Sequence, residues 1–103
     1  MFFDLTYLFE EELMDKSTRI HLTKKLEVAE LDGDKAMIDF ETGKYFLLKG
    51  AANEIWDIIQ EDTKVEDIVL NLRAQYDVSE DECLSATISF LENLKKLGFI
   101  EAK

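Results

Sequence analysis

The fold is decided by the stretch from Leu31 to Trp56, which reads LDGDKAMIDFETGKYFLLKGAANEIW. Asp32-Gly33-Asp34 is a turn signal between two alternating segments, and Gly43 supplies the positive φ that a second tight turn needs. The pattern predicts three strands followed almost at once by an amphipathic helix that carries the single tryptophan. The expected strands are Thr23–Leu31, Lys35–Phe40 and Tyr45–Leu48.

The third strand, Tyr45–Leu48, is apolar on both faces. In the second strand, Ala36, Ile38 and Phe40 alternate with Met37, Asp39 and Glu41, and we expect the first set to face the core. One face of the third strand must pack on the helices, and the other needs cover. Because an uncovered strand at the edge of a small sheet can pair with another chain, the pattern favours a peptide-binding module over an enzyme.

Three helices are expected after the strands. The first spans about Gly50–Gln60. Thr63–Glu66 and Ser79–Glu82 match the capping-box spacing and predict the starts of the second and third helices. Gly98 predicts the end of the third helix, with Phe99 and Ile100 folding back onto its last turn.

The last helix is apolar over more than half of its circumference. One stripe consists of Cys83, Ala86, Phe90, Leu94 and Leu97. A second stripe consists of Leu84, Ile88 and Leu91, and Lys95 continues it. A surface helix needs one stripe to pack on a core. The second stripe is therefore either additional core or the wall of a groove beside the third strand.

Residues 1–17 predict a short amphipathic helix with acidic residues opposite its apolar stripe. We divide the chain into an N-terminal amphipathic extension, residues 1–20, and a folded domain, residues 21–103. The extension either packs on its own domain or frays, or it covers an apolar edge or groove of its own or a neighbouring molecule. Its apolar residues are Phe2, Phe3, Leu5, Leu8, Phe9, Leu13 and Met14.

Composition excludes several classes of function. The 103 residues suit one domain, and the formal net charge of −11, from 12 basic and 23 acidic residues, argues against nucleic acid and anionic membranes as partners. The N-terminus lacks the pattern of a signal peptide, and no window approaches the apolar length that spans a bilayer. We therefore expect a cytoplasmic protein.

We expect no catalytic residue, metal or cofactor. Cys83 and His21 are single residues of their kind, too few for a zinc or iron–sulfur site, and no third group orients them as a catalytic pair. The acidic runs Glu10–Glu12 and Glu80–Glu82 fit a solvated helix face and a helix start better than a general acid–base pair.

Most of the chain, about residues 22–100, resembles the PqqD family, the recognition elements of ribosomally synthesised and modified peptides. The resemblance implies an α+β, winged-helix-like fold with a three-stranded antiparallel sheet followed by three helices. Lys49 departs from the family, which often has asparagine there, and residues 1–20 have no counterpart. The matching segments are the hairpin Asp39–Phe46, the step Leu47–Trp56, the helix Thr63–Tyr76 and the ending Phe90–Ile100.

The resemblance implies a non-catalytic peptide chaperone. It would bind the leader of a precursor peptide by strand addition beside the third strand and against the last helix. It would then present the leader to a modifying enzyme such as a radical-SAM enzyme or a leader peptidase. Combining this with the apolar pattern, we expect the peptide-binding residues to be Tyr45, Phe46, Leu47, Leu48, Leu84, Ile88, Leu91 and Lys95.

Two alternatives stay open at this point. The fold class permits a winged-helix transcription regulator, although the charge opposes it and no helix carries the basic and amide side chains that read bases. A strand-edge homodimeric interaction domain would instead pair the third strand with its own copy.

Overall fold

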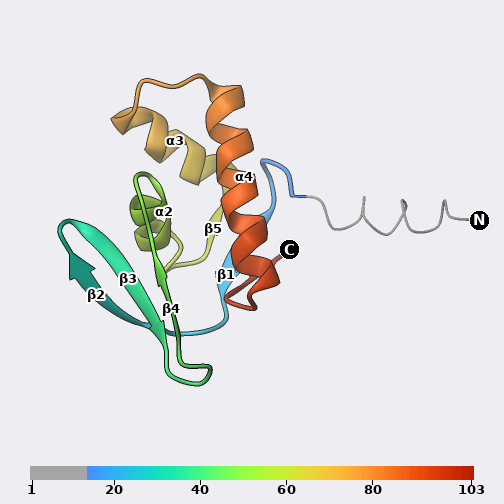
Figure 1. Cartoon of the computed structure of the whole chain (residues 1–103). Helices are drawn as coiled ribbons and strands as arrows, with labels where there is room; N and C mark the ends of the chain where they lie inside the picture. Colours follow the sequence, from blue (N-terminus) through green and yellow to red (C-terminus); the bar gives the residue numbers. More distant parts are fainter. Residues whose placement is uncertain (1–13) are drawn as a thin grey trace, which may run out of the picture.

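The computed structural model describes residues 14–103, so most of the helix expected over residues 1–17 lies outside the described residues. The described chain forms two small antiparallel sheets and three helices (Figure 1). This confirms the α+β class and a three-stranded antiparallel sheet followed by three helices, while the winged-helix likeness stays a prediction. The elements are β1 (Arg19–Leu22), β2 (Glu27–Leu31), β3 (Asp34–Asp39), β4 (Lys44–Leu47), α2 (Ala52–Ile58), β5 (Thr63–Lys64), α3 (Val65–Gln75), α4 (Glu80–Lys96) and β6 (Ile100–Ala102).

The first sheet is the meander β2-β3-β4, and both of its predicted turns are confirmed. Asp32 and Gly33 have φ of 53° and 88°, which is the pattern of a two-residue type I′ hairpin turn. Gly43 has φ of 77°, and its amide donates to the Asp39 carbonyl over 2.8 Å. These local signals place all three strands side by side.

The second sheet, with the order β5-β1-β6, was not expected. The prediction of one strand over Thr23–Leu31 is wrong, because the chain forms β1 earlier and begins β2 only at Glu27. β1 pairs with β6, so that Ile20 lies opposite Ala102. A strand whose partner lies at the far end of the chain cannot be recognised from the local alternation of apolar and polar residues. β1 also runs across the boundary that we drew after residue 20, and its Ile20 is fully buried in the core.

The core lies between the meander and the three helices. α3 packs against α4, and α2 lies behind the meander (Figure 1). The first helix was expected over Gly50–Gln60, and its apolar stripe is buried. The buried apolar residues of the helical half are Ile55, Trp56, Ile59, Val65, Ile68, Val69, Leu72, Cys83, Leu91 and Leu94.

The N-termini of the last two helices are capped in different ways. The capping box predicted at Thr63 is wrong, because Thr63 belongs to β5 and makes no side-chain cap for α3. The amides of Val65 and Glu66 instead donate to the carbonyls of Thr18 and Lys16, each over 3.0 Å. The cap predicted at Ser79 is confirmed.

The two ends of α4 follow local rules. The hydroxyl oxygen of Ser79 accepts from the Glu82 amide over 3.1 Å. Gly98 has φ of 81°, and the Phe99 amide donates to the Leu94 carbonyl, as expected for a glycine just beyond a helix end. Phe99 and Ile100 fold back into the core as predicted, and Ile100 begins β6.

The faces of β3 are reversed relative to the expectation that Ala36, Ile38 and Phe40 face the core. Met37 is the β3 residue in the core cluster, and it pairs across the sheet with Phe46 of β4. Ile38 lies on the opposite face, and the side chain of Phe40 is 76% exposed. Apolar residues occupy both faces of this strand, so alternation could not choose between them.

An ion pair compensates the one carboxylate on the core-facing side of β3. Nζ of Lys24 lies 2.9 Å from Oδ2 of the buried Asp39 and 2.7 Å from Oε1 of Glu41. The Lys24 ammonium lowers the pKa of Asp39 below its ordinary value, and the Glu41 and Asp39 carboxylates raise the pKa of Lys24. The contacts hold the 23–26 connection against the β3–β4 turn.

Asp39→Asn should therefore remove a stabilisation that depends on pH. A carboxylate with a lowered native pKa stabilises the fold above its unfolded pKa of about 3.9, and this contribution is lost as the pH falls through the native value. Urea unfolding at about pH 7, 5, 4 and 3 should show a gap between the wild type and Asp39→Asn that narrows on acidification. Asp77→Asn, in an exposed loop, is the matched control, and a gap that is constant with pH would contradict the assignment.

Candidate functional site

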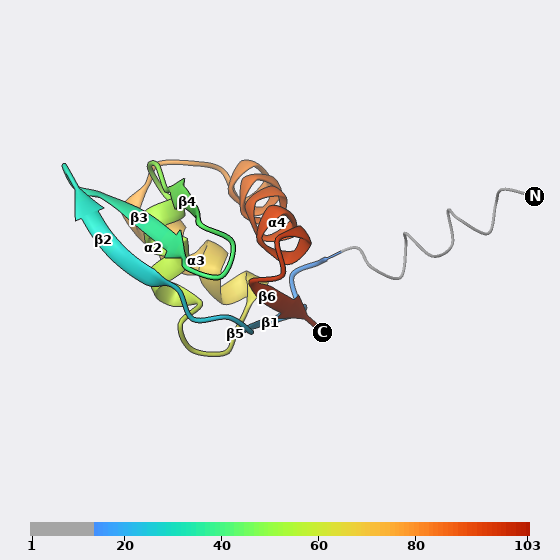
Figure 2. The same ribbon diagram turned by 60° about the horizontal axis from the view of Figure 1, so that its bottom comes forward.

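The meander has one free edge beside a helix. β4 is the edge strand nearest α4, and β2 lies on the far side of the sheet, as the two views in Figures 1 and 2 show. Within residues 14–103, no strand pairs with the outer side of β4. This edge is therefore available for another extended chain.

The register identifies the backbone groups at this edge. The Leu48 amide donates to the Lys35 carbonyl over 2.8 Å, which places these residues at a hydrogen-bonded position of the ladder, although the Lys35 amide itself donates to the Asn53 side chain. Hydrogen-bonded and non-hydrogen-bonded positions alternate along an antiparallel ladder, so the backbone of Phe46 also bonds to β3. The N–H and C=O groups of Tyr45 and Leu47 therefore point away from β3, toward the free edge. Those groups can hydrogen-bond a guest strand.

The side chains of the strand divide between the two sheet faces. Phe46 packs edge-on against Phe99, with ring centroids 5.4 Å apart, and Leu48 is buried. Tyr45 and Leu47 are exposed on the opposite face. The Phe46 side chain thus packs β4 against the segment that follows α4. The hydrogen-bonding edge of β4 stays open.

A hollow of about 400 Å³ begins where β4 ends. It lies between the start of α2, the end of α3 and the first half of α4, and we call it the helical hollow. Its volume is within the range of about 300–1,000 Å³ that is usual for ligand sites. Its lining is mostly apolar and consists of Lys49, Ala51, Ala52, Ile55, Leu72, Tyr76, Val78, Glu82, Cys83, Ala86, Thr87 and Phe90.

Thr87 is a lining residue of the helical hollow that carries a buried, unpaired hydroxyl. Its side chain is 1% exposed, and its hydroxyl has no hydrogen-bond partner within the described part of the chain. A buried hydroxyl without a partner costs about 1–3 kcal/mol, and native structures leave few such groups. The hydroxyl oxygen itself exposes less than 1 Å² of surface, so the hollow presents mainly apolar atoms to a guest.

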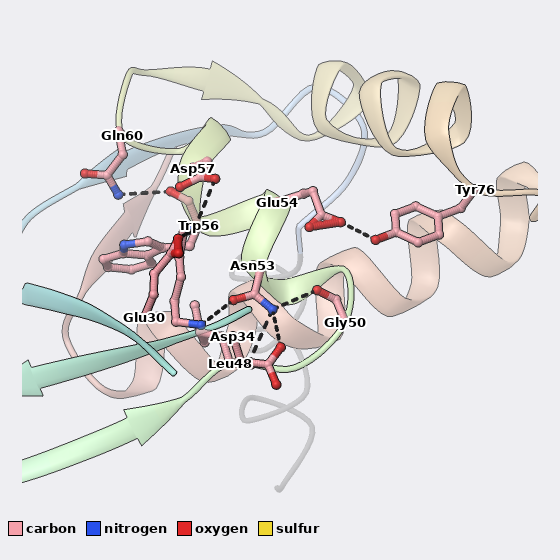
Figure 3. Close-up of polar contacts among 11 residues, drawn as sticks. Glu30, Asp34, Leu48, Gly50, Asn53, Glu54, Trp56, Asp57, Gln60 and Tyr76 are labelled. Carbon is pink, nitrogen blue, oxygen red and sulfur yellow. Dashed lines mark hydrogen bonds and ion pairs between the residues drawn. The ribbon is translucent and has the colours of Figure 1, made fainter. Parts of the chain in front are cut away.

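Asn53 connects the meander to the start of α2 (Figure 3). Its side-chain oxygen accepts from the Lys35 amide over 2.7 Å. Its side-chain nitrogen lies 3.1 Å from Oδ1 of Asp34, 3.1 Å from the Gly50 carbonyl and 3.4 Å from the Leu48 carbonyl. One buried amide thus holds the end of β4 at the entrance of the hollow.

The rim of the hollow carries charges of both signs. Lys49 is exposed, and its Nζ lies 3.5 Å from Oδ2 of Asp34. The Tyr76 hydroxyl donates to the Glu54 carboxylate, and this hydrogen bond raises the pKa of Tyr76 (Figure 3). Glu82 adds a further carboxylate. A bound peptide would therefore contact an apolar lining inside the hollow and charged side chains at its rim.

None of the eight residues expected to bind peptide lines the helical hollow. On α4, at about 100° per residue, Ala86 and Phe90 occupy the flank toward the hollow, and Leu84, Ile88 and Lys95 occupy the other flank. Leu91 is fully buried, so it supports the fold and is not exposed to a guest. Ala86 and Phe90 belong to the stripe that the sequence assigned to the core.

The chain's single cysteine and histidine lie in separate places. Nδ1 of His21, exposed on β1, is 2.7 Å from Oδ1 of Asp62. Cys83 is buried in α4, with its sulfur 3.9 Å from the Val69 carbonyl. Among the described residues, no group of three or more histidine, cysteine, aspartate or glutamate side chains is placed to hold a metal ion. In the same residues, no helix combines the length and apolar character that crossing a bilayer requires.

The fold and the open edge define a small α+β domain that presents one strand beside a helix. The chain belongs to the PqqD family: residues 34–100 match the family model described as coenzyme PQQ synthesis protein D (PqqD). This confirms the resemblance seen in the sequence.

A solved structure described as TbiB1 in complex with the TbiA(beta) leader peptide has the same fold, with a TM-score of 0.70 and 25% sequence identity. The match covers 79% of this chain and 94% of that chain. No curated protein matches this chain significantly.

Proposed function

We propose that this chain is a non-catalytic recognition domain for the leader of a ribosomally synthesised precursor peptide. The leader adds as a strand to the free edge of β4, and the domain presents it to a modifying enzyme. Membership of the PqqD family and the leader peptide bound by TbiB1 support this function. The observation that carries it is the outward direction of the backbone groups of Tyr45 and Leu47 beside α4.

Recognition has two parts in this proposal. The edge of β4 supplies backbone hydrogen bonds, which give affinity with little sequence preference. A leader that runs past Leu48 reaches the helical hollow, where an apolar side chain contacts Ala86 and Phe90. The hollow therefore selects the leader sequence.

The net charge favours a neutral or basic leader. A chain with a charge of −11 attracts cations and repels acidic peptides over about one Debye length, roughly 8 Å at physiological salt. Because an unstructured peptide loses conformational freedom on binding, we expect an affinity on the order of micromolar to sub-micromolar. Added salt should weaken it.

Leu47→Pro tests strand addition. Proline removes the outward N–H of residue 47 and places its ring against the guest strand, while the pairing of β4 with β3 uses other backbone groups. Peptide affinity should fall at least about tenfold. Leu47→Ala is the matched control, because it removes the same side chain and keeps the N–H, and it should bind more tightly than Leu47→Pro.

The probes are synthetic leader peptides: the TbiA(beta) leader and the leader of any short precursor reading frame beside this chain's gene. Amide chemical shifts around Tyr45 and Leu47 should move during titration, and light scattering should show one domain per complex. If no probe moved these amides, leader recognition would be contradicted. A stable dimer through β4 that leaders do not dissociate would favour the homodimeric alternative.

A further inference from the structure

The face of the meander that points away from the core is apolar, and no element within residues 14–103 covers it. We call it the outer apolar face, and its residues are Leu31, Ala36, Ile38, Phe40, Tyr45 and Leu47, of which Ala36 is buried among its neighbours and Ile38 is half-buried. Cross-strand pairing places Ile38 beside Tyr45 and Ala36 beside Leu47 on one side of the sheet. A hollow of about 490 Å³ opens on this face, and Leu31, Phe40 and Tyr45 are part of its lining.

Three large side chains of the outer apolar face are mostly exposed to solvent. The side chains of Leu31, Phe40 and Tyr45 are 58%, 76% and 74% exposed. An antiparallel sheet with one solvated face normally alternates apolar inward and polar outward residues. No described element of residues 14–103 packs on this side of the sheet (Figures 1 and 2). A contiguous apolar face of this kind is typical of a protein-interaction site.

The outer apolar face is continuous with the edge where the leader is proposed to bind. Tyr45 and Leu47 offer their backbone groups to the guest strand and their side chains to the outer face. Successive side chains of a strand point to opposite faces, so every second residue of a bound leader extends the same surface. A partner docked there contacts the domain and the leader together.

Charge argues against a second copy as the occupant. Two chains would bring together net charges of −11 each, and the charged residues at the face are Glu27, which pairs with Ile38, and Lys44, which lines the hollow. An apolar surface rimmed by lysine and arginine would bury the face and complement the net charge of −11 of this chain. The modifying enzyme is the partner that must meet the leader while this domain holds it.

We propose that the outer apolar face is the docking surface for the modifying enzyme, through an apolar patch with a basic rim. This rests on the proposed function. Leader and domain form one composite surface, so the enzyme binds the leader-loaded domain more tightly than the empty one. Leu31 and Phe40 extend this surface beyond the leader edge.

The test compares Leu31→Glu and Phe40→Glu with Leu70→Glu, which makes the same change at an exposed leucine of α3. Leader affinity, measured by fluorescence anisotropy, should stay within about twofold in all three variants. Binding of the leader-loaded domain to the purified peptide-modifying enzyme encoded beside this chain's gene should weaken at least about tenfold in the first two and stay unchanged in Leu70→Glu.

Three outcomes would overturn the proposal. Equal enzyme binding by Phe40→Glu and Leu70→Glu would remove this face from the interface and leave leader recognition intact. A wild-type dimer that Phe40→Glu converts to a monomer in light scattering would assign the face to a second copy. An absence of leader binding by the wild type would overturn the proposed function, and this inference with it.

Discussion

Ala86→Trp should abolish leader-peptide binding and leave the domain folded. Ala86 lies on the flank of α4 that lines the helical hollow, and its methyl group leaves the space beside Thr87 and Phe90 open. An indole at this position fills part of a hollow of about 400 Å³ and competes with the leader's anchoring side chain. We expect a loss of affinity of at least about a hundredfold, the size of effect seen when an interface anchor is lost.

The matched control is Ser85→Trp. Residue 85 is also exposed on α4, but the helix turns it about 100° away from residue 86, and it does not line the hollow. Ala86→Trp costs less than about 0.7 kcal/mol in helix propensity, and Ser85→Trp costs almost nothing because serine and tryptophan have similar propensities, so neither should unfold α4. Anisotropy titrations should show that Ser85→Trp keeps the leader affinity that Ala86→Trp loses. Amide spectra should show that both variants are folded. Equal affinities would exclude the hollow from leader recognition.

Asn53→Ala should have the largest effect on stability. It leaves the Lys35 amide and the Leu48 carbonyl without their side-chain partner, at a place where β3, β4 and α2 meet, while the Gly50 carbonyl keeps the backbone amide of residue 53. With each buried unpaired group costing about 1–3 kcal/mol, we expect the free energy of unfolding to fall by about 2–4 kcal/mol. Peptide affinity should fall as well, because the end of β4 is no longer held at the entrance of the hollow.

Asn71→Ala is the control for this change. Asn71 is exposed on α3, and its side chain accepts a hydrogen bond from Gln75. Its loss should change the free energy of unfolding by no more than about 0.5 kcal/mol. Urea unfolding gives both values, and hydrogen exchange of the Lys35 amide should accelerate in Asn53→Ala. Similar stability of the two variants would show that the Asn53 network does not hold the sheet to the helix.

Local chemistry explains which features could be read from the sequence. The turns at Asp32-Gly33 and Gly43, the cap at Ser79 and the helix end at Gly98 each depend on residues within a few positions. A left-handed φ or a cap hydrogen bond is satisfied inside its own segment, so composition and spacing are enough. The third strand, Tyr45–Leu48, was also recognisable, because it is apolar on both faces and lies between the Gly43 turn and the start of a helix.

Tertiary pairing decided the rest. β1 exists because Ile20 pairs with Ala102, and Thr63 belongs to a strand because it pairs with Ile20 on the other side of β1. On β3 and on α4, apolar residues cover more than one face, so the sequence alone could not tell which face packs on the core. Long-range packing selected Met37 over Ile38 for the core, and it turned Ala86 and Phe90 toward the hollow. Short-range signals determined the two hairpin turns and both ends of α4, and contacts between distant segments determined the second sheet and which faces remain for a partner.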